Sequence, residues 1–155
     1  MSIKLDSNLI YLDMGKSNLK LDFYKSLYIY LEDTKKYYPG FKAWFDEKVI
    51  PDLLSFDREL IIEYRNNLIA GIAIIKKSEN KVCTLKVMDN FKNRGIALKL
   101  IEKCFLILET KQPFFTISEE KLPEYQNIFK HYNFKLTSVH NGLYRNNKKE
   151  YFFNE

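Results

Sequence analysis

Residues 84–103 read TLKVMDNFKNRGIALKLIEK, and the change of pattern inside this stretch decides the fold. An apolar, strand-like run gives way to a polar and basic loop, a single glycine follows at Gly95, and an amphipathic helix begins after it. A helix start presents backbone N–H groups without partners in the helix, and the aligned peptide dipoles add roughly half a positive charge there. Lys92, Asn93 and Arg94 place two cations and an amide directly before that end. The stretch therefore predicts a phosphate site between a strand and a helix.

Two small residues support this interpretation of the turn. Gly95 has no Cβ, so a ligand can approach its backbone closely, and Ala97 keeps the first turn of the helix slim. The turn is not a P-loop, because the Gly-Lys-Ser/Thr ending is missing, and it is not a dinucleotide fingerprint, because two of the three glycines are missing. The pattern thus predicts a pyrophosphate cradle that matches neither of these two motifs.

The length and composition suit one domain covering residues 1–155, with 46% apolar and 29% charged residues. No run of eighteen apolar residues exists, and the N-terminal stretch has no long apolar segment, so we expect neither a membrane span nor a secretory signal. Cys83 and Cys104 lie inside apolar patterns, which predicts core thiols and a cytoplasmic protein. His131 and His140 have no cysteine or carboxylate at ligand spacing, so no metal site is expected.

The net charge of +5 permits an anionic partner without naming one. Lys and Arg are spread along the chain rather than clustered, which makes a nucleic-acid binder the weaker hypothesis. The eleven Tyr and twelve Phe are most simply explained as core residues.

The hydrophobic periods predict alternating helices and strands. Strands are predicted at residues 8–13, 59–64, 68–75, 81–88, 113–118, 134–139 and 150–153. Helices are predicted at residues 21–37, at residues 41–50 with a stop at Pro51, directly after Gly95, and through residues 122–132. In the strand at 81–88, Cys83, Leu85 and Val87 are expected on one face.

The order of these elements indicates the sheet type. The second, third and fourth predicted strands form an antiparallel meander, and the third is apolar throughout, as expected for a central strand. The strand–helix–strand crossover that follows implies at least one parallel pair. We therefore expect a mixed α/β (α+β) sheet with helices on both faces.

The motif Lys92-Asn93-Arg94-Gly95-Ile96-Ala97 resembles motif A of the GCN5-related N-acetyltransferases (GNAT), written Q/R-x-x-G-x-G/A. Lys92 stands where that family has Gln or Arg, and Asp89 stands where a Pro is common. The resemblance covers about residues 59–135. It implies a GNAT-like, mostly antiparallel central sheet of six to seven strands.

The resemblance also implies acetyl-CoA as cosubstrate. In the family, the fourth strand splays from the fifth, and the pantetheine arm pairs with the exposed strand edge. The backbone N–H groups of residues 92–97 would hold the pyrophosphate. The candidate cofactor-binding residues are Leu85, Lys86, Val87, Lys92, Asn93, Arg94, Gly95, Ile96 and Ala97, together with Phe129 on the later helix.

For catalysis, the resemblance implies direct attack by a primary amine in a ternary complex, with a general base and a general acid. Many relatives carry the acid as a Tyr four residues before a Gly-Phe pair. Here that pair is Asn133-Phe134, so the position holds Phe129, whose ring cannot donate a proton. Tyr132 or Tyr125, on the same predicted helical face, is an alternative donor, and simple packing explains both as well.

Glu63 is the candidate base, because a carboxylate amid apolar residues can have a raised pKa. The alternative is that Glu63 faces solvent at a strand end. The catalytic candidates are therefore Glu63 and Tyr132, and Ser118 and Glu119 are candidates on the substrate side. The aromatic residues of the first two helices form either an acceptor pocket or a packed helix pair.

The leading functional hypothesis is an acetyl-CoA-dependent N-acetyltransferase acting on an unidentified amine acceptor of a small molecule or protein. The alternative is a non-catalytic module that binds and senses acyl-CoA. A homodimer is compatible with the sequence, whereas a membrane partner is not expected.

Overall fold

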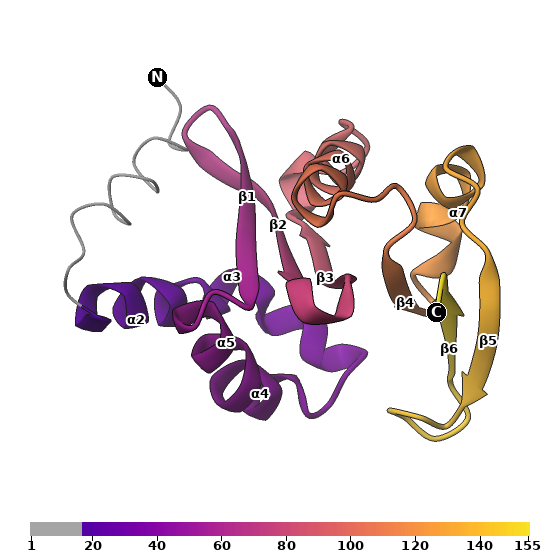
Figure 1. The fold of residues 1–155 in the computed structure, drawn as a ribbon, viewed down its shortest axis with the longest axis horizontal. Coiled ribbons are helices and arrows are strands. Elements are labelled where there is room, and N and C mark those ends of the chain that lie inside the picture. The colour runs from indigo at the N-terminus through magenta and orange to yellow at the C-terminus, as the bar shows by residue number, and fades with distance from the viewer. Residues whose placement is uncertain (1–16) are drawn as a thin grey trace.

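The computed structural model describes residues 17–155, so the strand expected at residues 8–13 lies outside the described residues (Figure 1). The described chain forms a six-stranded sheet in the order β1-β2-β3-β4-β6-β5. All neighbouring strands are antiparallel except β3 and β4. The strands are β1 (Arg58–Arg65), β2 (Leu68–Lys76), β3 (Lys81–Val87), β4 (Phe114–Ser118), β5 (Leu136–Asn141) and β6 (Lys149–Phe153). The expected fold class, a mixed and mostly antiparallel sheet, is confirmed.

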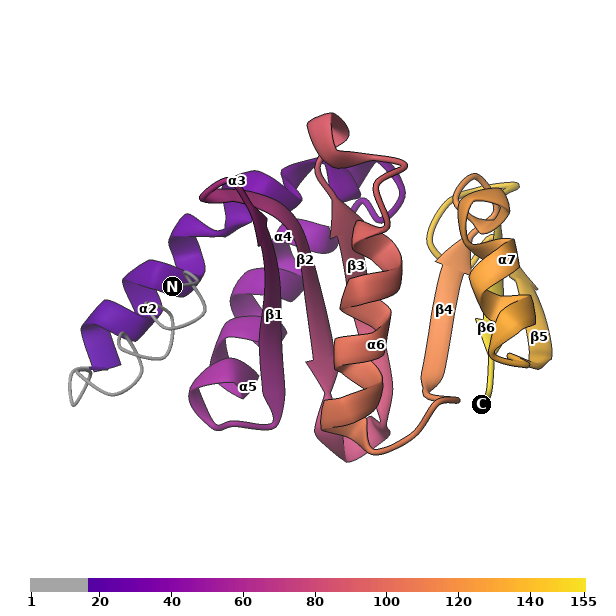
Figure 2. The same cartoon turned by 90° about the horizontal axis from the view of Figure 1, so that it is seen from above.

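Helices cover both faces of this sheet (Figures 1 and 2). One core cluster joins the sheet to the N-terminal helical segments, and a second joins it to the later helices. The first group is α2 (Ser17–Ser26), α3 (Tyr28–Leu31), the 3₁₀ segment η1 (Glu32–Lys36), α4 (Phe41–Trp44), the π-helical segment η2 (Phe45–Val49) and α5 (Ile50–Leu54). The second group is α6 (Ile96–Leu108) and α7 (Leu122–His131).

The strand β2 is buried on both faces, as its unbroken apolar run predicts. Ile72 and Ile74 pack into the cluster of the N-terminal helices, while Ala73 and Ile75 pack into the cluster of α6. A hairpin turn at Asn66 and Asn67 leads into β2, and both asparagines have left-handed backbone angles (φ 51° and 63°). Such angles favour the tight turns that match the twist of a hairpin.

Gly71 of β2 lets α6 lie close to the sheet. A Cβ at this position would lie 2.8 Å from Cδ1 of Leu100 and 2.9 Å from Cγ2 of Ile96. Real Cβ atoms do not come that close to other heavy atoms, so a larger residue here would require Leu100 and Ile96 of α6 to shift. Ile96 and Leu100, which would meet this Cβ, are both buried in the core between α6 and the sheet.

The helix predicted at residues 41–50 does not stop at Pro51. It continues through α5 to Leu54, and Pro51 lies in the first turn of α5, where a missing N–H is tolerated. The preceding residues 45–49 form a π-helical segment, which changes the hydrogen-bond pattern just before the proline. Ile50 and Leu53 are buried, so packing against the sheet favours continuation over termination.

The expected single face for Cys83, Leu85 and Val87 is wrong, because β3 contains an irregularity. The register between β2 and β3 shifts between Ile74 and Ile75, and Cys83 is left as the extra residue on β3. Cys83 consequently packs against the N-terminal helical cluster, whereas Leu85 and Val87 pack against the cluster of α6.

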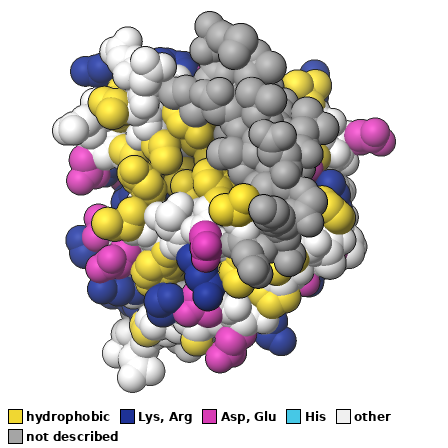
Figure 3. All heavy atoms as spheres, turned by 90° about the vertical axis from the view of Figure 1, so that its left-hand side faces the viewer, with side chains coloured by type: hydrophobic (Ala, Val, Ile, Leu, Met, Phe, Trp, Pro, Cys, Tyr) yellow, Lys and Arg dark blue, Asp and Glu magenta, His cyan; other side chains and the backbone are white. Residues whose placement is uncertain are grey.

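The side of the molecule formed by α2 and β1 carries hydrophobic side chains among charged ones (Figure 3). A cavity of about 440 Å³ lies there, lined mainly by residues of β1, α6 and the segment after α5. It includes the exposed side chains of Phe56 and Leu106. This cavity does not contain the start of α6, so it is separate from the phosphate cradle predicted from the sequence.

Candidate active site

The parallel strands β3 and β4 diverge after a short paired segment. They pair only at Lys81 with Phe114 and at Val82 with Phe115, and Figure 2 shows them separating beyond that point. A cavity of about 880 Å³ occupies the space between them. Its wall is made by β3, β4, the start of α6, the start of α7, the segment 34–44 and the hairpin residues Leu143 and Tyr144. The splayed strands expected from the sequence are thus present.

The start of α6 opens into this cavity. Gly95 is the N-cap residue with φ 76°, and Asn93 also has a left-handed backbone (φ 61°). Among residues 17–155, no side chain caps this helix start, and no acidic residue lies in its first turn. A Cβ built on Gly95 would meet no atom of the described chain within 4 Å. The first N–H groups of α6 are therefore presented toward open space, as anion binding at a helix start requires.

Most of the predicted cofactor-binding residues lie together in the cavity wall. These are Leu85, Lys86, Val87, Lys92, Asn93, Gly95, Ile96 and Ala97. Arg94 is the exception in this stretch: it is outside the wall, and its guanidinium lies 5.9 Å from the centre of the Phe91 ring. The predicted contribution of Arg94 to ligand binding is thus limited to its backbone N–H and to its positive charge near the edge of the cavity.

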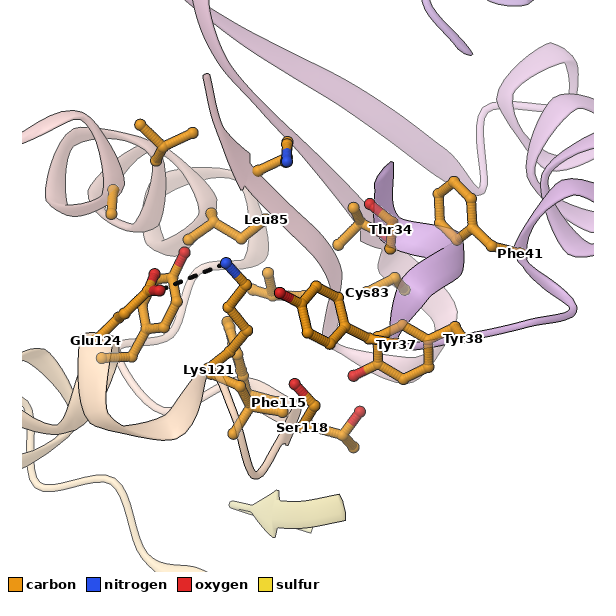
Figure 4. Close-up of a pocket in the computed structure, with 18 of the residues that line it drawn as sticks. Thr34, Tyr37, Tyr38, Phe41, Cys83, Leu85, Phe115, Ser118, Lys121 and Glu124 are labelled. Carbon is orange, nitrogen blue, oxygen red and sulfur yellow. Dashed lines mark hydrogen bonds and ion pairs between the residues drawn. The ribbon is translucent and has the colours of Figure 1, made fainter. Parts of the chain in front are cut away.

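The cavity wall carries more cationic than anionic side chains. Lys81, Lys86, Lys92 and Lys121 line it, and Glu124 is the acidic residue among the described lining residues. Lys121 lies 3.4 Å from Glu124 (Figure 4). This excess of positive charge suits a ligand that carries several phosphates.

Two further lysines of the cavity wall, Lys86 and Lys92, also have neighbouring carboxylates. Lys86 lies 3.9 Å from Asp33 of η1, and burial lowers the pKa of its ammonium. Lys92 lies 3.2 Å from Asp89, whose pKa is lowered by the hydrogen bond from Lys92. Asp89 is thus a negative charge beside the predicted phosphate cradle, at the position where the family it resembles commonly has Pro.

The assignment of Phe129 to the cofactor site is not supported by its position. Phe129 is buried, stacks on Phe134 with ring centres 4.8 Å apart and packs on Phe153 at 4.7 Å. It does not line the cavity. Phe129 lies one turn further along α7 than Tyr125, and at that level the helix packs on Phe134 and Phe153 rather than on the cavity.

The structure distinguishes between the two tyrosines considered as proton donors, Tyr132 and Tyr125. Tyr132 follows the last turn of α7, does not line the cavity, and packs edge-on against Phe105 at 4.8 Å. Tyr125 lines the cavity and is otherwise buried. Burial raises the pKa of its phenol, with a further contribution from Glu124. Tyr125 is therefore the phenol of α7 that is placed to meet a ligand.

The expectation of a raised pKa at Glu63 is wrong. Burial does oppose the ionisation of this carboxyl, but hydrogen-bonded ion pairs with Lys103 and Arg65 outweigh the effect and lower its pKa. Glu63 lies on β1, away from the residues that line the cavity. Its carboxylate ties β1 to α6 through Lys103, which is a structural role.

Sequence reasoning named Ser118 as a substrate-side candidate, and the structure places Ser118 in the cavity wall, but it missed the polar neighbours Tyr38 and Glu150. The phenol of Tyr38 donates a 2.6 Å hydrogen bond to Oε2 of Glu150, which is buried in β6. Figure 4 shows Tyr38 and Tyr37 directed toward Ser118 and Lys121. The available signal was Glu150 itself, a carboxylate directly before the apolar run YFF of a strand, where a charged residue is rarely buried unless paired.

The described residues 17–155 contain no group of three or more His, Cys, Asp or Glu side chains that could hold a metal ion. Among the same residues, no helix has the length and apolar character needed to cross a bilayer. Cys83 and Cys104 are both free thiols, and burial raises the pKa of Cys104 to about 12. Neither cysteine therefore has the properties of an activated nucleophile.

No protein-family model and no curated protein sequence matches this chain. Solved structures do match. An aminoglycoside 6'-N-acetyltransferase complexed with coenzyme A has 10% identity and a TM-score of 0.57, and the match covers 91% of this chain and 92% of that one. A GNAT family acetyltransferase from Elizabethkingia anophelis with acetyl-CoA bound has 15% identity and a TM-score of 0.55, covering 70% of this chain and 82% of that one.

NAA60 from Arabidopsis thaliana, in complex with a bisubstrate analogue, is similar at 15% identity with a TM-score of 0.54. That match covers 68% of this chain and 79% of the other. The protein therefore has the fold of the GCN5-related N-acetyltransferases, as the motif around Gly95 predicted. At these identities the similarity establishes the fold, and the function must be argued from the site.

Proposed function

We propose that this chain is an N-acetyltransferase that moves an acetyl group from acetyl-CoA to a primary amine by direct attack in a ternary complex. One observation carries the proposal: a single cavity is bordered both by the diverging strands β3 and β4 and by the uncapped start of α6. These two features suit the two halves of CoA, an extended arm with amide groups and a diphosphate.

The pantetheine arm would bind along β3. Beyond Val82 this edge has no pairing with β4, so backbone groups between Thr84 and Val87 remain for a ligand that pairs like an added strand. An unpaired edge of this kind is otherwise prone to unwanted association. The pyrophosphate would bind the N–H groups of residues 92–97, and Lys92 and Asn93 would contribute their side chains.

Acetyl transfer requires the protein mainly to position the two substrates and to move protons to and from them. The neutral amine attacks the thioester carbonyl, a C–N bond forms, the C–S bond breaks, and the CoA thiolate takes a proton. Tyr125 is our candidate donor of that proton, because it is the tyrosine of α7 that lines the cavity and a phenol carries its proton at neutral pH. It would thus take the role that Phe129 cannot perform.

The acceptor would enter between the segment 34–44 and the hairpin at Leu143 and Tyr144. This end of the cavity has aromatic walls formed by Tyr37, Tyr38 and Trp44. Of the two explanations for the aromatic residues of the N-terminal helices, we therefore adopt the acceptor pocket. Lys81 and Lys121 line the same cavity, which favours an acceptor with a single amine over a polycation.

A non-catalytic module that binds acyl-CoA remains the second candidate, and Phe129 at the usual acid position favours it. Both candidates require the same cradle and the same splayed strands. They differ in whether the thioester is consumed.

Two measurements on the purified protein separate the possibilities. Calorimetric titration with CoA tests the cradle, and thiol release from acetyl-CoA tests transfer with a panel of amines that includes small primary amines, peptides with free N-termini and aminoacyl-tRNA. Binding of CoA with thiol release and an acetylated amine supports the transferase. Tight binding of CoA without release on any amine supports the sensing module, and absence of CoA binding refutes both.

We also propose that the chain acts as one domain in the cytoplasm, where free thiols such as Cys83 and Cys104 persist.

A further inference from the structure

The end of the cavity opposite the cradle holds three polar groups from three segments. Tyr38 comes from the turn between η1 and α4, Ser118 ends β4, and Glu150 lies on β6. Ser118 and Glu150 are directly opposite each other in the antiparallel ladder, so their side chains lie on the same face of the sheet. Tyr38 and Ser118 line the cavity, and the phenol of Tyr38 reaches the carboxylate of Glu150 behind them.

The hydroxyl of Ser118 has no hydrogen-bond partner among the described residues, although the side chain is 1% exposed. A buried polar group without a partner costs about 1–3 kcal/mol, so natural proteins usually satisfy it. Because Ser118 borders the cavity, a bound ligand can supply the missing partner. This observation points to a polar ligand group at this end, independently of the acetyl-CoA site.

Glu150 is a carboxylate in an apolar setting. It is 3% exposed, and burial raises its pKa, although hydrogen bonds from Tyr38 and Thr116 act in the opposite direction. Burial, followed by the neighbouring carboxylate, raises the pKa of Tyr38. The phenol is thus protonated at neutral pH and points its proton at Glu150.

The other ionisable groups around Glu150 come from every neighbouring element. Arg145 of the β5–β6 hairpin and Lys81 of β3 act on its charge and lower its pKa. Tyr144 of the same hairpin packs edge-on against Tyr38 with ring centres 5.0 Å apart. His140 of β5 is the ladder partner of Glu150 and hydrogen-bonds Ser138 at 2.9 Å. Tyr38 and Thr116 both border the cavity and hydrogen-bond the carboxylate, and Tyr38 is the ionisable one of the two.

We propose that this cluster is the subsite for the acceptor's ammonium group and that its proton leaves through Tyr38 to Glu150. The inference rests on the proposed transferase function and adds to it the route by which the amine becomes nucleophilic. The ammonium gives one proton to Oη of Tyr38 while the phenolic proton moves to Oε2 of Glu150. Ser118 Oγ accepts a second N–H and holds the nitrogen in place.

The step is balanced and needs no further reactant. The ammonium becomes a neutral amine, Tyr38 is a neutral phenol before and after, and Glu150 changes from carboxylate to carboxylic acid. Glu150 returns its proton to solvent after the acetylated product has left. Tyr38 is the catalytic residue in this scheme because it touches the amine, and Glu150 is a positioning residue that acts through it.

The test is the pH dependence of acetylation by the Glu150→Gln and Tyr38→Phe variants, with the best amine of the panel as acceptor. We expect kcat/KM to fall about 100-fold or more in each, as for loss of a general base. In the wild type, kcat/KM should fall as pH drops through the pKa of Glu150, because the carboxylate must be ionised to accept a proton. That acid limb should disappear in Glu150→Gln and persist in Glu150→Asp.

Three controls separate this role from a structural one. Tyr151→Phe removes a phenol from the neighbouring position of β6, which packs against the α6 cluster, and should change kcat/KM less than about twofold. Ser118→Ala should raise KM for the amine with little change in kcat, as for loss of uniform binding. The affinity for CoA should be unchanged in all of these variants.

The outcomes distinguish the two proposals. If the wild type fails to bind CoA or to acetylate any amine, the proposed function falls, and this inference falls with it. If the wild type acetylates an amine and Glu150→Gln keeps its activity within threefold, only the proton route is refuted. A Glu150→Gln variant that is slower but retains the acid limb also refutes it, because a structural role explains that result.

Discussion

Replacing Gly95 with Ala tests the cradle most directly, because the structure supplies a matched control. Gly95 and Gly142 have nearly identical left-handed backbones (φ 76° and 77°), and a Cβ on either would meet no atom within 4 Å. Both substitutions should therefore lower the free energy of unfolding by the same amount, about 1–2 kcal/mol, because each places a side chain in the left-handed region without a clash. Only the Cβ at position 95 stands in front of the first N–H groups of α6.

The expected effect on binding follows from the hydrogen bonds at risk. A hydrogen bond between a backbone amide and a charged phosphate oxygen contributes about 1.5–3 kcal/mol. If the added methyl group displaces the diphosphate enough to break one such bond, the Kd for CoA rises about 10- to 150-fold. Gly142→Ala lowers stability equally but leaves the Kd within about twofold of the wild type, because Gly142 is not among the residues that line the cavity and lies far along the chain from the start of α6.

Isothermal titration with CoA gives the two Kd values, and urea unfolding followed by circular dichroism gives the two losses of stability. If the two variants lose the same stability and only Gly95→Ala binds CoA more weakly, the result supports binding of the diphosphate at the start of α6. If Gly95→Ala binds CoA as tightly as the wild type, the diphosphate does not lie at the start of α6. If both variants lose affinity to the same extent, the effect is general destabilisation, and the assignment of the turn is refuted as well.

Three further outcomes follow from the structure. Asp89→Asn removes the carboxylate paired with Lys92 beside the predicted cradle, so CoA should bind about two- to fivefold more tightly at low salt, and the gain should shrink as salt is added in a titration series; unchanged affinity would mean that Lys92 does not face the phosphates. Gly71→Ala places a Cβ 2.8 Å from Leu100 and should lower the free energy of unfolding by about 1–3 kcal/mol in a urea titration, whereas a neutral result would show that α6 shifts freely. The hydrogen bond from Arg145 lowers the pKa of Glu120 from 4.5 to about 2. A lowered carboxyl pKa stabilises the fold above the unfolded value, so this contribution is complete above about pH 4.5 and is lost as pH falls toward 2. In acid titrations monitored by fluorescence, Arg145→Gln should be less stable than the wild type at pH 6, and the difference should vanish near pH 2; a constant difference across that range would contradict the pairing.

The sequence alone predicted the class of the sheet and the strand–turn–helix arrangement around Gly95, because both leave local patterns in the chain. Three local patterns carried these predictions: the apolar run of β2, the asparagine turn before it and the single glycine before α6. Each spans only a few residues, so it can be recognised without knowledge of the tertiary structure. The positions of residues 92–97 relative to a strand and a helix follow from the same short stretch. Helix boundaries were less accurate, as at Pro51, where burial of Ile50 and Leu53 outweighs the local preference to stop.

The tertiary structure decided which side chains share a site. Glu63 had the apolar neighbours of a general base, yet Lys103, forty residues away, pairs with it and lowers its pKa. The contact between Tyr38 and Glu150 spans 112 positions of the chain, so no pattern of local spacing indicates it. Phe129 was expected at the cofactor, but α7 turns it into an aromatic cluster. The period of a helix or strand determines which of its residues share a face. The packing of distant segments determines which other side chains that face contacts, and the composition of an active site depends on these contacts.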